Sequence, residues 1–161
     1  MDEILEILEK DARTSPEEIA AMTKRSVGAV KGAIKKYERD GVVIKYKAVI
    51  NKGLIKDAPR GACALIEVNV APQKNLGFDY VAERIYMFPE VTNCFLISGT
   101  YDLLITVDGK DMQEVANFVA AKLSPMEGVR GTVTHFLLRK YKEDGEIFKP
   151  HEKEKRLAIS Y

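Results

Sequence analysis

The chain has 161 residues, of which 46% are apolar and 30% are charged, and its formal net charge is +1. This length and composition predict a globular protein with one domain or two small ones. No apolar run is long enough to cross a bilayer, and the acidic start is the reverse of a signal peptide, so we expect a cytoplasmic protein with no membrane partner.

Charge is polarised within the first fifty residues. The stretch from Met1 to Thr23 holds seven acidic and two basic residues, a net charge of −5. The window from Lys24 to Lys47 holds eight basic and two acidic residues, a net charge of +6. A basic window of this strength in a nearly neutral chain favours a surface for nucleic acid.

Three helices are predicted in this region. An apolar stripe indicates a first helix that ends near Asp11, and the capping-box pattern from Ser15 to Glu18 begins a short second helix over residues 16–22. Ser26 is the expected cap of a third helix that ends at Asp40. The apolar residues of the third helix recur at helical spacing: Val27, Val30, Ile34 and Tyr37.

The other face of the third helix is basic and carries Gly28 and Gly32. Each glycine costs a helix about 1 kcal/mol relative to alanine, so we expect them to allow close approach to a groove, with close packing on the second helix as the alternative. A tight turn before a basic third helix is the helix-turn-helix arrangement, and strands at 42–44 and 46–50 would add a wing. The residues expected to bind DNA are Lys24, Arg25, Ser26, Gly28, Lys31, Gly32, Lys35, Lys36, Arg39, Lys45 and Lys47.

A second domain is predicted after a hinge. Residues 51–60 lose their periodicity and include Gly53 and Pro59, so they form the expected linker. The expected organisation is therefore a DNA-binding domain over 1–50, this linker, a second domain over 61–141 and a tail over 142–161. Hydrophobic periodicity in the second domain predicts strands at 61–70, 91–98, 101–107 and 132–141, and helices at 78–85 and 112–123. This βαββαβ order is that of a ferredoxin-like fold with both helices on one side of an antiparallel sheet.

The predicted sheet has apolar residues on both faces. If Ala64 and Ile66 face the helices, then Cys63 and Leu65 face away. A second subunit covering that face is the simplest explanation, and coverage by the C-terminal tail is the alternative. The tail also includes a possible edge strand at 156–160, with a frayed terminus as its alternative. Cys63 and Cys94 have no metal or redox spacing and are expected to be buried free thiols.

The run SPEEIAAMTKRSVGAVKGAIKKYERDGVVIKYKAVI resembles the N-terminal domain of the Lrp/AsnC, or feast/famine, transcription regulators. The later segments SGTYDLLITV and EGVRGTVTHFLL are similar to the effector domain of the same family. The resemblance implies a sequence-specific regulator of double-stranded DNA that self-associates as a dimer. Whether dimers stop there or close into an octamer, a tetramer of dimers, is left open. Ala33 departs from the pattern, because many relatives have arginine at that position.

The resemblance also implies a small-molecule effector, most often an amino acid, held near Gly99, Thr100, Tyr101 and Asp102. A glycine lets a backbone approach a ligand, and an aspartate can pair with an α-ammonium group. The alternative is a purely structural turn in which the aspartate accepts hydrogen bonds from nearby backbone donors.

Catalysis has little support in the sequence. His135 lies in a strand and His151 in a charged tail, neither beside a nucleophile, and neither a phosphate loop nor a zinc-type cluster occurs. We therefore expect no catalytic residue, no metal and no cofactor beyond the effector. Two alternatives stay open: a sirohaem-decarboxylase-like enzyme of the same layout, and an amino-acid sensor that acts on a protein partner.

Overall fold

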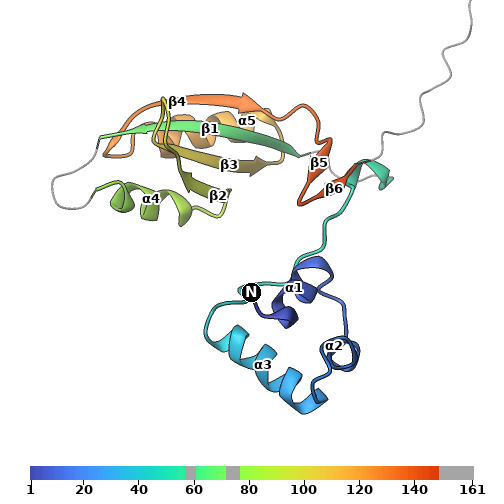
Figure 1. The fold of residues 1–161 in the computed structure, drawn as a ribbon. Coiled ribbons are helices and arrows are strands. Elements are labelled where there is room, and N and C mark those ends of the chain that lie inside the picture. Colours follow the sequence, from blue (N-terminus) through green and yellow to red (C-terminus); the bar gives the residue numbers. More distant parts are fainter. Residues whose placement is uncertain (57–60, 72–76, 149–161) are drawn as a thin grey trace, which may run out of the picture. The chain divides into compact units, whose positions relative to one another are not determined.

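The computed structural model describes residues 1–56, 61–71 and 77–148, and it divides the chain into two compact units, Met1–Ile50 and Asn51–Tyr161 (Figure 1). Across the described ranges, no helix combines the length and the apolar character that a bilayer-spanning segment requires. The strand expected at 156–160 lies outside the described residues.

The first unit is a bundle of three short helices, α1 (Glu3–Lys10), α2 (Pro16–Thr23) and α3 (Val27–Arg39). Their apolar stripes meet in one small core, as the periodicity predicted. Side-chain caps fix where the helices begin: the Asp2 carboxylate accepts from the Ile4 amide, and Ser15 and Glu18 form the predicted capping box. The fully or nearly buried residues of this core are Ile4, Leu8, Ile19, Ala20 and Val30.

The predicted wing strands are wrong. Residues 42–50 contain no strand, although β-branched and aromatic residues are frequent there: Val42, Val43, Ile44, Tyr46, Val49 and Ile50. The amides of Val42 and Val43 both donate to the Tyr37 carbonyl, at 2.9 and 3.1 Å, so the chain first curls back on the end of α3. A strand needs a partner for its backbone groups, and no described residue of the first unit supplies one.

The second unit contains a four-stranded sheet and two helical segments. A two-stranded hairpin follows, with its turn at Asp144 and Gly145, both of which have positive φ. In chain order the elements are η1 (Lys52–Leu54), β1 (Ala62–Val70), α4 (Asp79–Tyr86), β2 (Val91–Leu96), β3 (Leu103–Gly109), α5 (Met112–Phe118) with its π-helical continuation η2 (Val119–Leu123), β4 (Val129–Phe136), β5 (Lys142–Glu143) and β6 (Glu146–Ile147).

The sheet has the strand order β2-β3-β1-β4, and every neighbouring pair is antiparallel (Figure 1). Ile66 in the middle of β1 lies opposite Ile105 of β3 and Thr134 of β4. Each helix connects two strands that are separated by one strand between them, which is the topology of the predicted ferredoxin-like fold. The α+β class and the βαββαβ order are therefore confirmed.

Both helices pack on one face of this sheet. Ile66 and Val68 of β1 are fully buried in one cluster with Val81 of α4 and Val115 of α5, as the alternation in β1 predicted. Gly128, just before β4, has a φ of +92°, and a Cβ there would lie 2.7 Å from the Val81 side chain. This glycine is therefore required both for the turn and for the approach of α4.

The opposite face of the sheet is open in the described chain and carries apolar side chains. Leu65, Phe95 and Val133 are 37%, 52% and 47% exposed. The strand register brings them close together, because Glu67 lies opposite both Val133 and Leu104, and Phe95 lies opposite Leu104. On the same face the His135 imidazole lies 3.1 Å from the Glu67 carboxylate.

The two cysteines are free, as expected, but half-buried rather than fully buried. Burial and then a hydrogen bond to Asp108 raise the pKa of the Cys63 thiol to about 11, and burial also raises the pKa of Cys94. Cys63 is half-buried because its strand face is the open one. A thiol with a raised pKa is a poor nucleophile at neutral pH, since only the thiolate reacts readily.

Candidate functional site

The outward face of α3 is open and centred on its two glycines. At 100° per residue, Gly28 and Gly32 lie opposite the side that carries the buried Val30. Apart from the adjoining residues and backbone of α3 itself, no described residue comes within 4 Å of a Cβ placed at either glycine. The alternative that these glycines serve packing on α2 is therefore wrong. Lysines flank them on both sides of the same face: Lys31, Lys35 and Lys36.

Ala33, the position at which the family resemblance led us to expect arginine, does not belong to this outward face. Its side chain is half-buried and packs against the core of the first unit, beside Ile34. The side chain of an arginine at this position would project from α3 at the margin of the outward face. The absence of an arginine therefore leaves the centre of the face, with its glycines and lysines, unchanged.

The turn that leads into α3 is held in a fixed shape. Lys24 ends α2 in the left-handed region, with a φ of 55°, a conformation that costs a residue with a side chain about 1 kcal/mol or more. The Ser26 hydroxyl accepts from the Ala29 amide at 3.2 Å and so caps α3. The hydroxyl hydrogen of Ser26 stays available as a donor, because the cap uses only a lone pair.

Three cations of the predicted DNA surface are held by carboxylates. The Lys31 ammonium lies 2.7 Å from Glu17, the Arg39 guanidinium lies 2.8 Å from its neighbour Asp40, and Arg25 pairs with Asp2 at 3.1 Å. Within the described part of the chain, the five other cations of this surface form no ion pair: Lys24, Lys35, Lys36, Lys45 and Lys47.

The Asp2 carboxylate connects α1, α3 and the turn between α2 and α3, and sequence reasoning missed this role. It caps α1, accepts a short hydrogen bond from the Tyr37 hydroxyl on α3, and forms a two-point pair with Arg25 in the turn before α3. These contacts, Tyr37 and the Ile4 amide first, hold the pKa of Asp2 at about 2, below its ordinary value of 3.8. The partners lie 23 and 35 residues away, so no local pattern could indicate them.

The two wing lysines lie on the irregular segment after α3. Lys45 and Lys47 are exposed, and they flank Tyr46, whose hydroxyl donates to the Glu38 carboxylate at 3.0 Å. This contact ties the segment to the last turn of α3. The lysines are therefore attached to the predicted DNA surface by one side-chain contact rather than by a strand.

The predicted effector residues lie together in the connection between β2 and β3, over residues 97–102. The Ile97 amide donates to the Asp102 carbonyl at 2.8 Å, and the Asp102 amide donates to the Val68 carbonyl at 3.1 Å, so the connection is fastened to β1. Gly99 and Thr100 are exposed at its tip, and Tyr101 is half-buried. The strand predicted at 91–98 ended too late, and the strand predicted at 101–107 began too early. The hydrogen bonds of this connection form a six-residue turn between the two strands instead.

Asp102 has the structural role that was considered as an alternative. Its Oδ2 accepts from the Val70 amide at 2.7 Å. This amide needs a partner because the pairing of β1 with β4 shifts register between Asn69 and Val70. The carboxylate thus stabilises the end of β1 while its residue belongs to the exposed turn.

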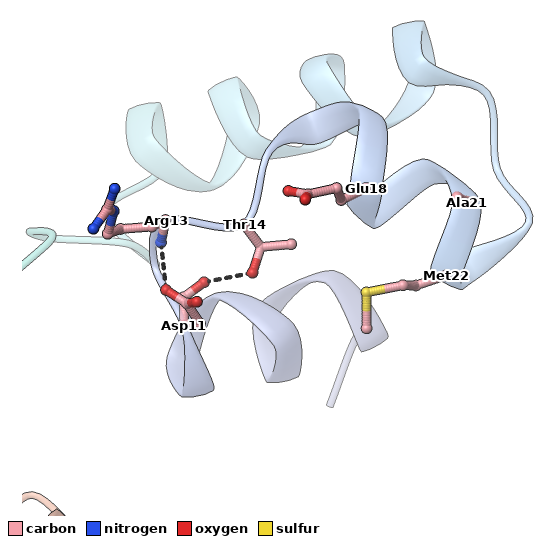
Figure 2. Close-up of a pocket in the computed structure, with 6 residues that line it drawn as sticks. All are labelled: Asp11, Arg13, Thr14, Glu18, Ala21 and Met22. Atoms are coloured by element: carbon pink, nitrogen blue, oxygen red, sulfur yellow. Dashed lines mark hydrogen bonds between the residues drawn. The ribbon is translucent and has the colours of Figure 1, made fainter.

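A groove lies between the turn that follows α1 and the helix α2 (Figure 2). Its floor includes the turn after α1, in which the Asp11 carboxylate accepts from the Arg13 amide and the Thr14 hydroxyl donates to the Asp11 carbonyl, both at 2.9 Å. None of its lining residues is among those predicted to bind DNA or an effector: Asp11, Arg13, Thr14, Glu18, Ala21 and Met22. These hydrogen bonds give the turn its shape, and the groove follows from the shape of the turn.

A three-helix unit with an open basic third helix, joined to a ferredoxin-like unit, defines the class of helix-turn-helix proteins with a separate ligand-binding domain. Comparison with family models agrees: residues 63–147 match the Lrp/AsnC ligand binding domain, and residues 3–44 match a winged helix-turn-helix DNA-binding domain. The chain belongs to the Lrp/AsnC family of transcriptional regulators.

Individual relatives support the same assignment over nearly the whole chain. An HTH-type transcriptional regulator of Bacillus subtilis, YugG, is 45% identical over 98% of this chain and 95% of its own. The regulator FL11 of Pyrococcus furiosus is 29% identical over 89% of this chain and 91% of its own. The transcriptional regulator NMB0573 of Neisseria meningitidis, solved as a complex with L-Met, is 26% identical with a TM-score of 0.68, covering 88% and 89% of the two chains. The decarboxylase and protein-sensor alternatives are not favoured by these relatives.

Proposed function

We propose that this regulator binds double-stranded DNA sequence-specifically through the outward face of α3. The observation that carries the proposal is the open, basic face centred on Gly28 and Gly32, with no described residue near either glycine. In this arrangement Ser26 and the outward residues of α3 lie in the major groove, where the missing side chains of Gly28 and Gly32 let the helix backbone approach the bases and Lys31 and Lys35 reach the base edges. The cations expected to hold phosphates are Lys24, Arg25, Lys36, Arg39, Lys45 and Lys47.

We further propose that an amino acid is the effector and that it binds at the turn formed by Gly99, Thr100, Tyr101 and Asp102. The L-Met bound to the neisserial regulator supports the ligand class, and the exposed tip beside a carboxylate supports the location. An α-ammonium group would pair with the carboxylate, and backbone amides would receive the ligand carboxylate.

Self-association is the third part of the proposal. The open sheet face, with Leu65, Phe95 and Val133, has the apolar character of a surface that a second copy covers. A two-fold dimer would present two recognition helices to half-sites about one helical turn apart. We also propose that four such dimers assemble into an octamer. The location proposed for the protein is the cytoplasm.

Binding of the purified protein to the DNA upstream of its own coding region, at several salt concentrations, tests the DNA interface. If a dimer neutralises roughly six to eight phosphates, the slope of log affinity against log salt should lie near −5 to −7, from about −0.9 per phosphate. A slope near zero would refute the interface. Repeating the titration with each common amino acid tests the effector, and an affinity unchanged by all of them would refute that part.

A further inference from the structure

Two carboxylates of the acidic stretch from Met1 to Thr23 form ion pairs with cations of the basic window from Lys24 to Lys47. Glu17, in the first turn of α2, and Asp2, before α1, each hold a cation of the predicted DNA surface. We propose that Glu17 is an internal competitor for DNA phosphate: it holds Lys31 in the free protein, and Lys31 must leave it to engage the DNA. This inference rests on the proposed DNA interface.

The geometry of this pair suits an exchange of partners. The Lys31 Nζ lies 2.7 Å from the Glu17 Oε1, between two helices whose relative position is fixed by the core. The side chains of Lys31 and Glu17 are 53% and 58% exposed, so a phosphate can reach the ammonium without any helix moving. The hydrogen bond from Lys31 lowers the pKa of Glu17, so the carboxylate keeps its charge to a lower pH than an ordinary glutamate does.

A carboxylate and a phosphate compete for the same ammonium group because both are anionic oxygen acceptors. If Lys31 leaves Glu17, the ion pair is lost. If Lys31 bridges the two, the Glu17 carboxylate lies beside a phosphate and repels it. In either case Glu17 raises the free energy of the DNA complex relative to the free protein, and it restrains binding to any duplex.

In the ion pair between Arg25 and Asp2, the carboxylate would compete with phosphate in the same way. Replacing Asp2 would nevertheless be a poorer test of the competition. Asp2 also caps α1 and accepts from Tyr37, so its replacement would disturb the fold. Glu17 has no such role, since the capping box of α2 is made by its neighbour Glu18 with Ser15. Glu17 therefore isolates the competition from the architecture.

The expected effect is modest and measurable. Exposed ion pairs of this kind correspond to about 1.5- to 5-fold in an equilibrium constant. We expect Glu17→Gln to bind a short random-sequence duplex more tightly by this factor for each DNA-binding unit. The matched control is Glu18→Gln, which removes the same charge from the next residue and keeps the capping box, because glutamine also serves at that position.

The experiment compares the full-length wild type, Glu17→Gln, Glu18→Gln and the same two substitutions in a Lys31→Met background, all by titration of the duplex at low salt. The proposal predicts that Glu17→Gln gains more affinity than Glu18→Gln and that this excess disappears without Lys31. Equal gains for both glutamines, an excess that persists without Lys31, or weaker binding by Glu17→Gln would overturn it. Failure of the DNA interface itself gives a different result, because binding of the wild type in the salt series described above would then not depend on salt concentration.

Discussion

Replacement of Gly32 by alanine separates the two uses that a glycine can have in α3. Gly32 lies inside the helix, more than one turn from either end, and a Cβ there meets no described residue within 4 Å. Alanine should therefore stabilise the helix by about 1 kcal/mol, the ordinary difference in helix propensity. If the outward face of α3 enters the major groove, the added methyl group should push the backbone away from the bases.

The magnitudes can be measured on the same protein. A stabilisation of about 1 kcal/mol corresponds to roughly fivefold slower exchange of the α3 amide hydrogens under conditions where exchange reports local opening. Loss of one base contact costs about 1–3 kcal/mol, so affinity for the upstream DNA should fall at least about fivefold per recognition unit. The Gly32→Ala protein is thus expected to be more stable and to bind DNA less tightly.

Two results would refute this reasoning. Faster exchange of the α3 amides would mean that the methyl group meets a neighbour, contrary to the open space at this position. Slower exchange with unchanged affinity would mean that the backbone at Gly32 does not approach the DNA. A useful control is Lys36→Ala, which keeps the helix propensity high and removes a predicted phosphate contact, so it should weaken binding to all duplexes alike.

Three further outcomes are expected. Lys24→Gly should stabilise the first unit by about 1 kcal/mol in urea unfolding, because glycine relieves the left-handed φ of 55°, while removal of the charge weakens DNA binding. Asp102→Ala should lower the free energy of unfolding by about 1–3 kcal/mol, because it leaves the buried Val70 amide without its acceptor. Asp102→Asn keeps an acceptor, so it should lose the effector response with a smaller change in stability. Because the pKa of Asp2 falls from 3.8 to about 2 on folding, its contribution to stability is fully present above the unfolded value and is lost as the pH falls toward 2. Urea midpoints of Asp2→Asn should lack that part of the pH dependence.

Helix positions in the first unit could be predicted from the sequence because their signals are local. Ser15 and Glu18 lie three residues apart and form the capping box, and Ser26 caps α3 from the residue before it. The alternation of β1 was equally informative, since Ile66 and Val68 are buried on the face that it indicated. Such signals need only the neighbouring residues, so tertiary structure does not overrule them here.

The contacts that shape the site could not be predicted because they join distant residues. Lys31 is 14 residues from Glu17, and Asp102 is 32 residues from the Val70 amide that it accepts from. Charge patterning indicated an acidic and a basic half but gave no pairs between them. The turn at 97–102 was placed too short for the same reason, since its backbone is fastened to Val68 of another strand.

The absence of the expected strands at 42–44 and 46–50 affects how the lysines of that segment can bind DNA. The pattern from Val42 to Ile50 has the alternation of a strand, but β-propensity takes effect only where a neighbouring strand completes the hydrogen bonds. Lys45 and Lys47 therefore lie on a segment whose backbone has no strand partner, and any backbone freedom that is lost when they hold phosphates costs about 1–2 kcal/mol for each residue that becomes fixed. Lys35 and Lys36 are already on a helix and avoid that backbone cost. The helix lysines should accordingly contribute more to affinity than the wing lysines, which alanine substitution of Lys35 and of Lys45 measures directly.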